Sequence, residues 1–282
     1  MKYSIILGTL NRSVEITNCL QSLRNQTETD FEIIIVDQSD NLETQQAIEK
    51  FNDLNIRYYR VDFKGLSKAR NYGMQHASGD YFCLVDDDAE YRSDYLTVVN
   101  NYSAIYHHAV LSGIIISNID HKTPFIDCSK VDNLHTFSSK ELLRYAPSAA
   151  LVFPQILYKA IGDFDERLGV GNNFASGEET DYLLRAIDCG FQVIHCKDMV
   201  VYHPIKNSSK NYKSIIQHAM GKGALFKIDF FERGKKRLCG FAVRNTIGML
   251  VKTLANIGGN YKLYAWRFKG FVIGFKTFEA KR

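Results

Sequence analysis

Three consecutive carboxylates, Asp86, Asp87 and Asp88, come directly after the apolar run Tyr81–Val85. Adjacent carboxylates repel one another, and a hard divalent cation relieves that repulsion because carboxylate oxygens are its preferred ligands. Magnesium-type sites take one or two carboxylates and complete their coordination with substrate phosphates. The cluster therefore predicts half of a metal site that a diphosphate completes, and the alternative is a solvated acidic turn.

A second acidic group, Glu178, Glu179 and Asp181, lies at the start of a predicted helix. Transfer of a group to a hydroxyl requires a base that takes the hydroxyl proton, and a carboxylate can do so. Ser176 and Glu179 also have the spacing of a helix capping box, and acidic residues in a first turn interact favourably with the helix dipole. On local sequence alone, the capping box and the catalytic base both stay open.

The elements that position the first cluster alternate between strands and helices. Strands are predicted at Tyr3–Leu7, Phe31–Val36, Ile56–Val61 and Tyr81–Val85, and helices at Ser13–Asn25, Leu42–Phe51 and Ser67–Gln75. Strands that are apolar on both faces and separated by helices indicate a parallel sheet covered on both sides. The predicted fold class is α/β.

Polar residues follow three of these strands. They are Thr9–Arg12 after the first strand, Asp37–Asp40 after the second and Asp86–Asp88 after the fourth. Ligands of open parallel sheets bind at the carboxyl ends of the strands. We therefore expect the three polar segments to meet at one edge of the sheet.

The second half of this region has a less regular pattern. Its predicted elements are a strand at Val110–Ile116, a polar connection at Asn118–Tyr145, a strand at Ala149–Phe153, a helix at Pro154–Ile161, a glycine-rich loop at Gly162–Gly177, a helix at Glu178–Cys189, and strands near Phe191–His195 and Met199–Tyr202. The polar connection and the glycine-rich loop are the segments where we expect an acceptor to bind.

Five motifs together resemble glycosyltransferase family 2, in the order and at roughly the spacing of that family. They are Val36–Ser39, Gly65–Gly73 with Ala77–Tyr81, Asp86–Asp88, Gly162–Glu166 and Gly177–Asp181. The resemblance covers about residues 3–205. It implies a GT-A fold, with a Rossmann-like, mainly parallel central sheet flanked by helices, a nucleotide-diphosphate sugar donor and an inverting mechanism.

The resemblance also implies roles for individual residues. Those implied to bind the nucleotide sugar are Thr9, Asn11, Arg12, Asp37, Ser39, Lys68, Arg70, Asp86 and Asp87. Asp37 is similar to the aspartate that contacts the base, and Lys68 or Arg70 would face the diphosphate. Gln38 departs from the Asp or Asn that many members carry before Gly-Ser, so the identity of the nucleotide base stays open.

For the metal, the resemblance implies that Asp88 is a direct ligand and that Asp86 faces both the ribose and the metal. His203, which follows the strand predicted at Met199–Tyr202, is similar to a histidine that completes the metal shell in some members. A neutral imidazole would favour manganese somewhat over magnesium. The alternative is a histidine that faces solvent or a backbone carbonyl. A zinc site is not favoured, because the cysteines and histidines of residues 189–203 lack paired spacing.

For the chemistry, the resemblance implies that Glu179 is the general base. Many members carry Asp there, in a Glu-Asp pair, and the fallback candidates are Glu178 and Asp181.

The net charge of +4 hides an asymmetry along the chain. Residues 206–282 hold 17 Lys and Arg against 3 Asp and Glu, a charge of +14, and the remaining 18 basic and 28 acidic residues give residues 1–205 a charge of −10. We therefore predict a catalytic domain at residues 1–205 and a basic, aromatic, helical extension at 206–282.

The basic extension is predicted to lie on an anionic membrane surface as amphipathic helices. Its most apolar stretch, Leu238–Ile257, is a poor membrane span because Arg244, Asn245 and Lys252 interrupt it. In the alternative, its aromatic residues pack as helical core. No nucleic-acid partner is expected, because no nucleic-acid-binding motif accompanies the charge.

The predicted location is the cytoplasm, peripheral at the inner face of the plasma membrane. The apolar run of Met1–Leu7 is too short for a signal-peptide core, and the six cysteines lack the spacing of disulfide pairs.

Two function classes follow from these observations. The first is an inverting glycosyltransferase that uses manganese or magnesium and acts on a glycan or lipid-linked saccharide. The second is a non-catalytic sugar-nucleotide-binding or membrane-adaptor protein with the same fold. Carboxylates at both acidic groups favour the enzyme.

Overall fold

A computed structural model describes residues 2–145, 148–204, 211–255 and 261–280. The chain forms two compact units, each with its own internal packing. The sheet unit comprises Met1–Asp163 and Leu183–Lys206, and the helical unit comprises Phe164–Tyr182 and Asn207–Arg282. The loop before Gly177 and the first turn of the helix that carries Glu179 thus belong to the helical unit.

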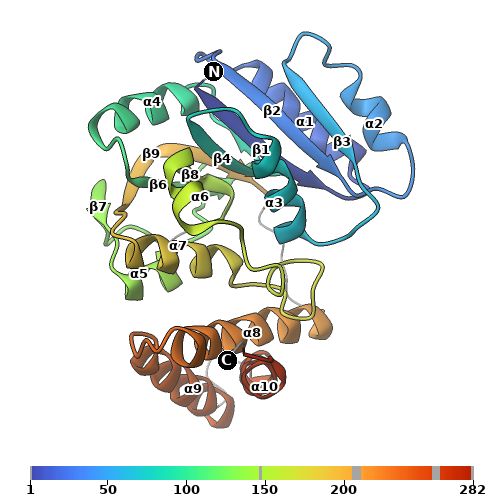
Figure 1. Cartoon of the computed structure of the whole chain (residues 1–282). Coiled ribbons are helices and arrows are strands. Elements are labelled where there is room, and N and C mark those ends of the chain that lie inside the picture. The colour runs from blue at the N-terminus through green and yellow to red at the C-terminus, as the bar shows by residue number, and fades with distance from the viewer. Residues whose placement is uncertain (1, 146–147, 205–210, 256–260, 281–282) are drawn as a thin grey trace. The chain divides into compact units, whose positions relative to one another are not determined.

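The described residues of the sheet unit form a nine-stranded sheet (Figure 1). Its strands are β1 (Tyr3–Thr9), β2 (Phe31–Asp37), β3 (Ile56–Arg60), β4 (Tyr81–Asp86), β5 (Glu90–Tyr91), β6 (Val110–Ser117), β7 (Leu134–Thr136), β8 (Leu151–Pro154) and β9 (Val193–His203). The order is β3-β2-β1-β4-β8-β6-β9-β5, and β7 pairs with β9. β1 to β4 run parallel, as do β6 and β9, whereas β8 is antiparallel to both of its neighbours. The predicted mainly parallel sheet is confirmed.

Helices cover both faces of this sheet (Figure 1). The helices between the strands and up to β9 are α1 (Ser13–Arg24), α2 (Glu43–Ile48), α3 (Leu66–His76), α4 (Tyr95–Ile105), α5 (Ser139–Tyr145), α6 (Gln155–Ile161) and α7 (Glu178–Asp188), with a short 3-10 turn η1 (Ser148–Ala150). α7 begins in the helical unit and continues into the sheet unit.

Successive residues of β2 enter different cores, because the side chains of a strand alternate between its faces. Ile33 and Ile35 pack in the cluster that contains Leu20 of α1, whereas Ile34 packs with Ala69 of α3. The whole of β2 is therefore apolar, as a strand covered on both faces must be.

Three sequence predictions of elements were incomplete. The connection at 118–145 contains β7 and α5, the two strands predicted near 191–202 are one strand, β9, and α4 and β5 were not predicted. The apolar run at 191–202 is interrupted by Lys197 and Asp198, which suggested a break. β9 instead stays continuous because it pairs with β6 through a register shift between Ser112 and Ile114.

The helical unit contains α8 (Tyr212–Lys227), a π-helical turn η2 (Ile228–Glu232), α9 (Cys239–Leu254) and α10 (Tyr261–Thr277). The predicted helical extension is confirmed over the described residues, and 206–210, 256–260 and 281–282 lie outside them. α8 and α10 touch at glycines: a Cβ added to Gly274 would lie 2.1 Å from the Met220 carbonyl oxygen.

None of the helices in the described parts of the chain is long and apolar enough to cross a membrane.

Candidate functional site

The turn after β4 brings two strand ends together that are not neighbours in the sheet. The Ala89 N–H donates to the Asp86 carbonyl oxygen at 3.0 Å, which closes the turn. β5 then pairs antiparallel with β9, so that Glu90 lies opposite Tyr202. Because antiparallel register continues by one residue on each strand, His203 at the end of β9 comes to lie beside this turn.

Asp86, Asp88 and His203 form a cluster that can hold a metal ion, with one ligand atom from each within 4.8 Å of the others. His203 Nε2 is 2.9 Å from Asp88 Oδ1 and 4.0 Å from Asp86 Oδ2. His203 Nδ1 lies 2.9 Å from the Pro204 carbonyl oxygen, which only accepts, so Nδ1 donates there and Nε2 faces the carboxylates. Two carboxylates and an imidazole suit manganese or magnesium.

The charges of the aspartates act on this histidine. Burial alone would lower the pKa of His203, but the hydrogen bond to Asp88 and the charges of Asp88 and Asp86 raise it above its ordinary value. A proton on Nε2 and a divalent cation would occupy the same position, so the two compete.

Asp87 connects the cluster to the loop after β1. Its carboxylate accepts from Thr9 Oγ1 at 2.8 Å and from Arg12 Nη1 at 2.6 Å. The same guanidinium lies 3.1 Å from Asp88 Oδ2. Burial raises the pKa of Asp87, and the charge of Arg12 together with the two hydrogen bonds opposes that rise. Arg12 thus supplies positive charge to two buried carboxylates.

Arg70 contacts the cluster from α3. Its side chain is buried, and Nη2 lies 3.0 Å from Asp86 Oδ1. Lys68, one of the two cations implied for the diphosphate, instead lies over the ring of Phe63, 4.4 Å from its centroid. Of these two cations, it is Arg70 that forms an ion pair with Asp86.

The polar residues that follow β2 form hydrogen bonds with the residues that follow β1. The buried Asp37 accepts from the Ser39 N–H and from the Tyr58 hydroxyl, both at 2.8 Å. Ser39 Oγ accepts from the Asn11 N–H at 2.8 Å, and Asn11 has a positive φ of 55°. The three strand ends that were expected to meet therefore do so.

The acidic group at 178–181 belongs to the helical unit. α7 begins at Glu178, so Gly177 occupies the cap position and Ser176 comes one residue too early for the capping box. The Ser176 hydroxyl donates to the His218 carbonyl oxygen at 2.7 Å instead. The capping-box interpretation is therefore wrong.

The three carboxylates of this turn have different surroundings. Asp181 is fully buried and forms an ion pair with Arg233, and Glu178 is buried too. Glu179 keeps partial exposure. Of the three carboxylates, Glu179 is thus the most exposed, and both fallback candidates are buried.

Sequence reasoning did not single out Arg233. It lies 52 residues from Asp181, and its only sequence signal is membership of the basic run 233–237.

Comparisons with known proteins agree with this architecture. A sequence model of the family described as Glycosyl transferase family 2 matches residues 4–156. The poly(ribitol-phosphate) beta-N-acetylglucosaminyltransferase TarS of Staphylococcus aureus is 36% identical over 93 residues, which cover 31% of this chain and 16% of TarS. A Methanococcus voltae dolichyl N-acetyl-alpha-D-glucosaminyl phosphate 3-beta-D-2,3-diacetamido-2,3-dideoxy-beta-D-glucuronosyltransferase is 26% identical over 243 residues, 81% of this chain and 75% of that protein.

A third relative, GalNAc(5)-diNAcBac-PP-undecaprenol beta-1,3-glucosyltransferase of Campylobacter jejuni, is 31% identical over 102 residues, 35% of this chain and 33% of that protein. The matched stretch thus spans less than a fifth of TarS and a third of the Campylobacter jejuni relative.

Two solved structures share the fold. The structure of TarS residues 1–349 with UDP has a TM-score of 0.61 at 19% identity and covers 98% of this chain and 90% of that one. The mannosyltransferase PcManGT from Pyrobaculum calidifontis, with GDP-Man and Mn2+, has a TM-score of 0.64 at 13% identity and covers 97% and 86%. At these identities the likeness concerns the fold alone, and the expected GT-A fold is confirmed.

Proposed function

The chain belongs to glycosyl transferase family 2, and from this premise we propose that it is an inverting glycosyltransferase that uses a nucleotide-diphosphate sugar. The observation that carries the proposal is the cluster of Asp86, Asp88 and His203 at the strand ends. Two carboxylates and one imidazole leave the remaining coordination positions of a divalent cation to substrate phosphates. The solved neighbours were determined with UDP, UDP-GlcNAc and GDP-Man.

In the proposed site, Asp86, Asp88 and His203 would hold manganese or magnesium. Such a cation neutralises charge on a leaving diphosphate. Arg70, already paired with Asp86, would add positive charge on the same side. The nucleoside would bind at the ends of β1 and β2. The residues there include Thr9, Arg12 and Asp37, which are described above.

Glu179 is proposed as the general base. It would accept the proton of an acceptor hydroxyl while the hydroxyl oxygen forms a bond to the anomeric carbon. The bond from that carbon to the diphosphate oxygen breaks, and its electron pair leaves with the nucleoside diphosphate. Attack opposite to the leaving group inverts the configuration. The partial exposure of Glu179, beside the burial of Glu178 and Asp181, supports this choice.

The proposed acceptor is a glycan or a lipid-linked saccharide at the cytoplasmic face of an anionic membrane. The names of two relatives contain undecaprenol and a dolichyl group, which are lipids. In this chain, α9 supports a membrane contact because one of its faces is apolar and exposed. That face, here called the α9 stripe, consists of Val243, Ile247, Leu250, Val251 and Leu254.

The α9 stripe has helical spacing and lies apart from the face of α9 that packs inward. Ala242 and Met249 on the inward face pack against Phe271 of α10. Exposed basic residues flank or precede the stripe, among them Lys236 and Arg244. An apolar stripe with neighbouring cations is typical of a helix that lies in the surface of an anionic bilayer.

The test is turnover of a panel of UDP-, GDP- and other nucleotide sugars with manganese, with magnesium and with EDTA. We expect metal-dependent transfer or donor hydrolysis for one donor. Asp88→Ala and Glu179→Gln should each lower transfer by about 100-fold or more, since a positioned base alone contributes that much. Asp53→Asn, an exposed carboxylate paired with Arg24, is the matched control and should keep activity.

If both Asp88→Ala and Glu179→Gln leave transfer unchanged, the mechanism is wrong. Tight binding of a nucleotide sugar without turnover of any donor would instead identify a non-catalytic sugar-nucleotide-binding protein.

A further inference from the structure

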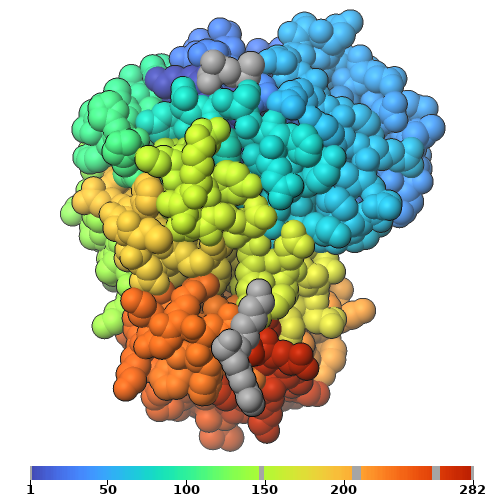
Figure 2. Space-filling model, in the orientation of Figure 1, coloured from blue at the N-terminus to red at the C-terminus, as the bar shows by residue number. Residues whose placement is uncertain are grey.

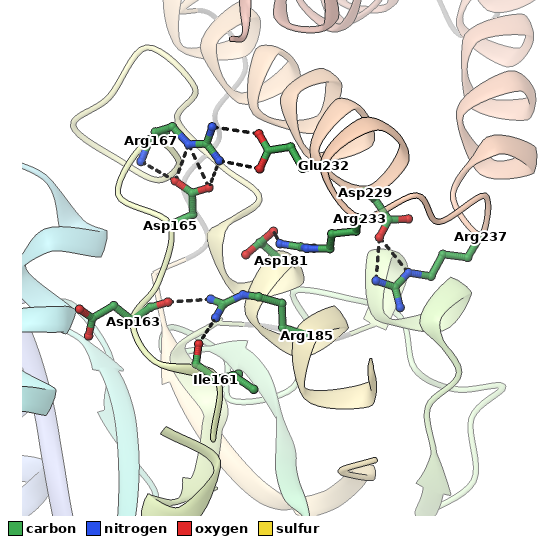
Figure 3. A network of polar contacts seen from close by, with 10 residues as sticks. All are labelled: Ile161, Asp163, Asp165, Arg167, Asp181, Arg185, Asp229, Glu232, Arg233 and Arg237. Carbon is green, nitrogen blue, oxygen red and sulfur yellow. Dashed lines mark hydrogen bonds and ion pairs between the residues drawn. The ribbon is translucent and has the colours of Figure 1, made fainter. Parts of the chain in front are cut away.

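The first turn of α7 is held by the chain's C-terminal segment. Asp181 is fully buried, and its carboxylate forms an ion pair with Arg233, the residue directly after η2 (Figure 3). A buried carboxylate is costly without a counter-charge, and removal of one partner of such a pair is strongly destabilising. The observed position of Asp181 therefore depends on Arg233.

The residue before Arg233 holds the loop that precedes α7. Glu232 accepts from Arg167 with both carboxylate oxygens, at 3.0 and 3.1 Å (Figure 3). Arg167 is fixed in turn by Asp165, and its guanidinium lies over the ring of Phe278, 4.6 Å from the centroid. Glu232 thus holds the loop before α7, and the next residue, Arg233, holds the first turn of α7.

α8 makes a third connection to the same segment. The Ser176 hydroxyl donates to the His218 carbonyl oxygen, and a Cβ on Gly221 would lie 2.2 Å from the Ser176 carbonyl oxygen. This close approach leaves room for glycine only. Residues 164–182 are therefore fixed by contacts from α8, η2 and Arg233.

A second buried ion pair holds η2 itself. The fully buried Asp229 accepts from Arg237 Nε and Nη2, at 2.9 and 2.7 Å (Figure 3). A π-helical turn is rare and marks a local constraint in a helix. Here it follows α8 and places the adjacent residues Glu232 and Arg233 at the end of the turn. Glu232 contacts the loop before α7, and Arg233 contacts the first turn of α7.

We propose that Arg233 is a positioning residue for Glu179, acting through Asp181, so that the C-terminal segment is part of the catalytic machinery. The inference rests on the proposed role of Glu179 as the base. Asp181 and Glu179 lie two residues apart on one helical turn and so point to different sides of it. Arg233 holds the buried side of that turn, and this sets the backbone from which the Glu179 carboxylate projects.

One consequence concerns deletion of the C-terminal segment, by which we mean residues 207–282. If Arg233 positions the base, such a deletion removes transfer even from a water-soluble acceptor, where membrane binding has no part. Loss of activity on deletion therefore does not identify a membrane role, and single substitutions must separate the two.

The experiment compares Arg233→Gln with Arg237→Gln, which removes the buried ion pair with Asp229 from the same part of the chain. Transfer to a soluble acceptor, manganese binding and thermal unfolding are measured for both. Arg233→Gln should lower kcat by about 100-fold, the size expected for a misplaced catalytic group, with manganese affinity and the donor KM within about threefold of wild type. Arg237→Gln should lower the melting temperature similarly but keep kcat within about threefold. Equal kcat losses in both variants would overturn the proposal.

Rescue provides the second arm. Asp181→Asn placed in the Arg233→Gln protein removes the carboxylate charge that Arg233 faced and leaves an amide pair, so it should recover kcat by about tenfold or more. If Arg233→Gln does not fold, the double variant and Arg233→Lys carry the comparison, with kcat of both expected between wild type and Glu179→Gln. Double-variant activity no higher than that of Glu179→Gln would overturn the proposal.

Glu179→Gln separates the two hypotheses. Full transfer by Glu179→Gln would remove the proposed base, whatever Arg233 does. Loss of transfer in Glu179→Gln together with wild-type kcat in Arg233→Gln would leave the base in place and overturn the positioning role alone.

Discussion

At the scale of single residues, the aspartate cluster is a set of charges that the protein itself largely compensates. Arg12 faces Asp87 and Asp88, Arg70 faces Asp86, and His203 faces Asp88. The protein's own side chains therefore offset part of the negative charge of the cluster. A cation would then replace part of this compensation rather than create it.

Arg12→Gln tests this compensation. Without the guanidinium, two buried carboxylates lose positive charge, so the free energy of unfolding of metal-free protein should fall by about 2 kcal/mol. In differential scanning calorimetry, the loss of stability caused by Arg12→Gln should be smaller at saturating manganese than in EDTA. Arg24→Gln, whose pair with Asp53 is largely exposed, should change stability by less than about 1 kcal/mol. An equal effect of both substitutions would contradict the role given to Arg12.

His195 connects single-residue chemistry to stability against acid. It is fully buried in β9, with the ring of Phe137 5.1 Å away between centroids. Burial, with a smaller effect of Lys197, lowers the pKa of His195 to about 4 from 6.5. The folded protein therefore binds a proton at this site only near pH 4, whereas the unfolded chain does so near pH 6.5.

Stability should consequently fall as pH decreases from about 6.5 to about 4, and this contribution should be exhausted below pH 4. The loss attributable to His195 is about 3 kcal/mol, from about 2.5 pKa units at 1.36 kcal/mol each. Urea unfolding at pH 7 and pH 4.5 should show a smaller pH dependence for His195→Leu than for wild type. The same dependence in both proteins would show that His195 is not the group responsible.

At the scale of elements, glycines decide how the C-terminal helices pack. Gly223 of α8 and Gly270 and Gly274 of α10 each have backbone atoms of the partner helix where a Cβ would lie, at 2.2, 2.5 and 2.1 Å. Side chains at these positions would push the helices apart. Gly248 of α9, in contrast, has nothing within 4 Å of an added Cβ.

Gly274→Ala and Gly248→Ala form a matched pair. Alanine favours a helix by up to about 1 kcal/mol over glycine, so Gly248→Ala should raise the melting temperature slightly. Gly274→Ala should lower it, because overpacking costs about 1–3 kcal/mol and exceeds that gain. Thermal unfolding followed by circular dichroism measures both. Stabilisation by Gly274→Ala would mean that α8 and α10 do not meet at this residue.

At the scale of the whole molecule, charge is divided between the two parts of the chain. Residues 206–282 carry +14 and residues 1–205 carry −10. Electrostatic attraction to an anionic surface is screened by salt, whereas burial of the α9 stripe in a bilayer is not. Figure 2 draws the residues of α8, α9 and α10 in orange to red, packed against one another.

Binding to vesicles of phosphatidylcholine with phosphatidylglycerol separates these contributions. We expect binding to weaken at about 0.5 M salt, because screening shortens the electrostatic range. Val243→Ser with Ile247→Ser should lower the partition coefficient by about tenfold, through lost apolar burial. Ile105→Ser, which removes an equally exposed apolar side chain from α4, is the control. Binding that responds neither to salt nor to the double substitution would exclude a membrane contact through α9.

The sequence by itself determined the α/β class, the strands β1 to β4 and the polar residues at their ends. Local information suffices for β1, β2 and β4, because a strand apolar on both faces has one stable environment, the middle of a covered sheet. The sequence also placed His203 at the end of a strand, whereas the metal role of His203 was implied by a resemblance rather than by spacing. The ends of α7 and of β4 were predicted to within one or two residues.

Only the tertiary structure decided what the buried charges do. It showed that Asp87 pairs with Arg12, that Asp181 pairs with Arg233, and that Ser176 lies one residue too early to cap α7. Such pairs join residues far apart in the chain, and a sequence states neither burial nor partner. The cost of burying a charge makes each pair specific, and that cost exists only once the surrounding elements have packed.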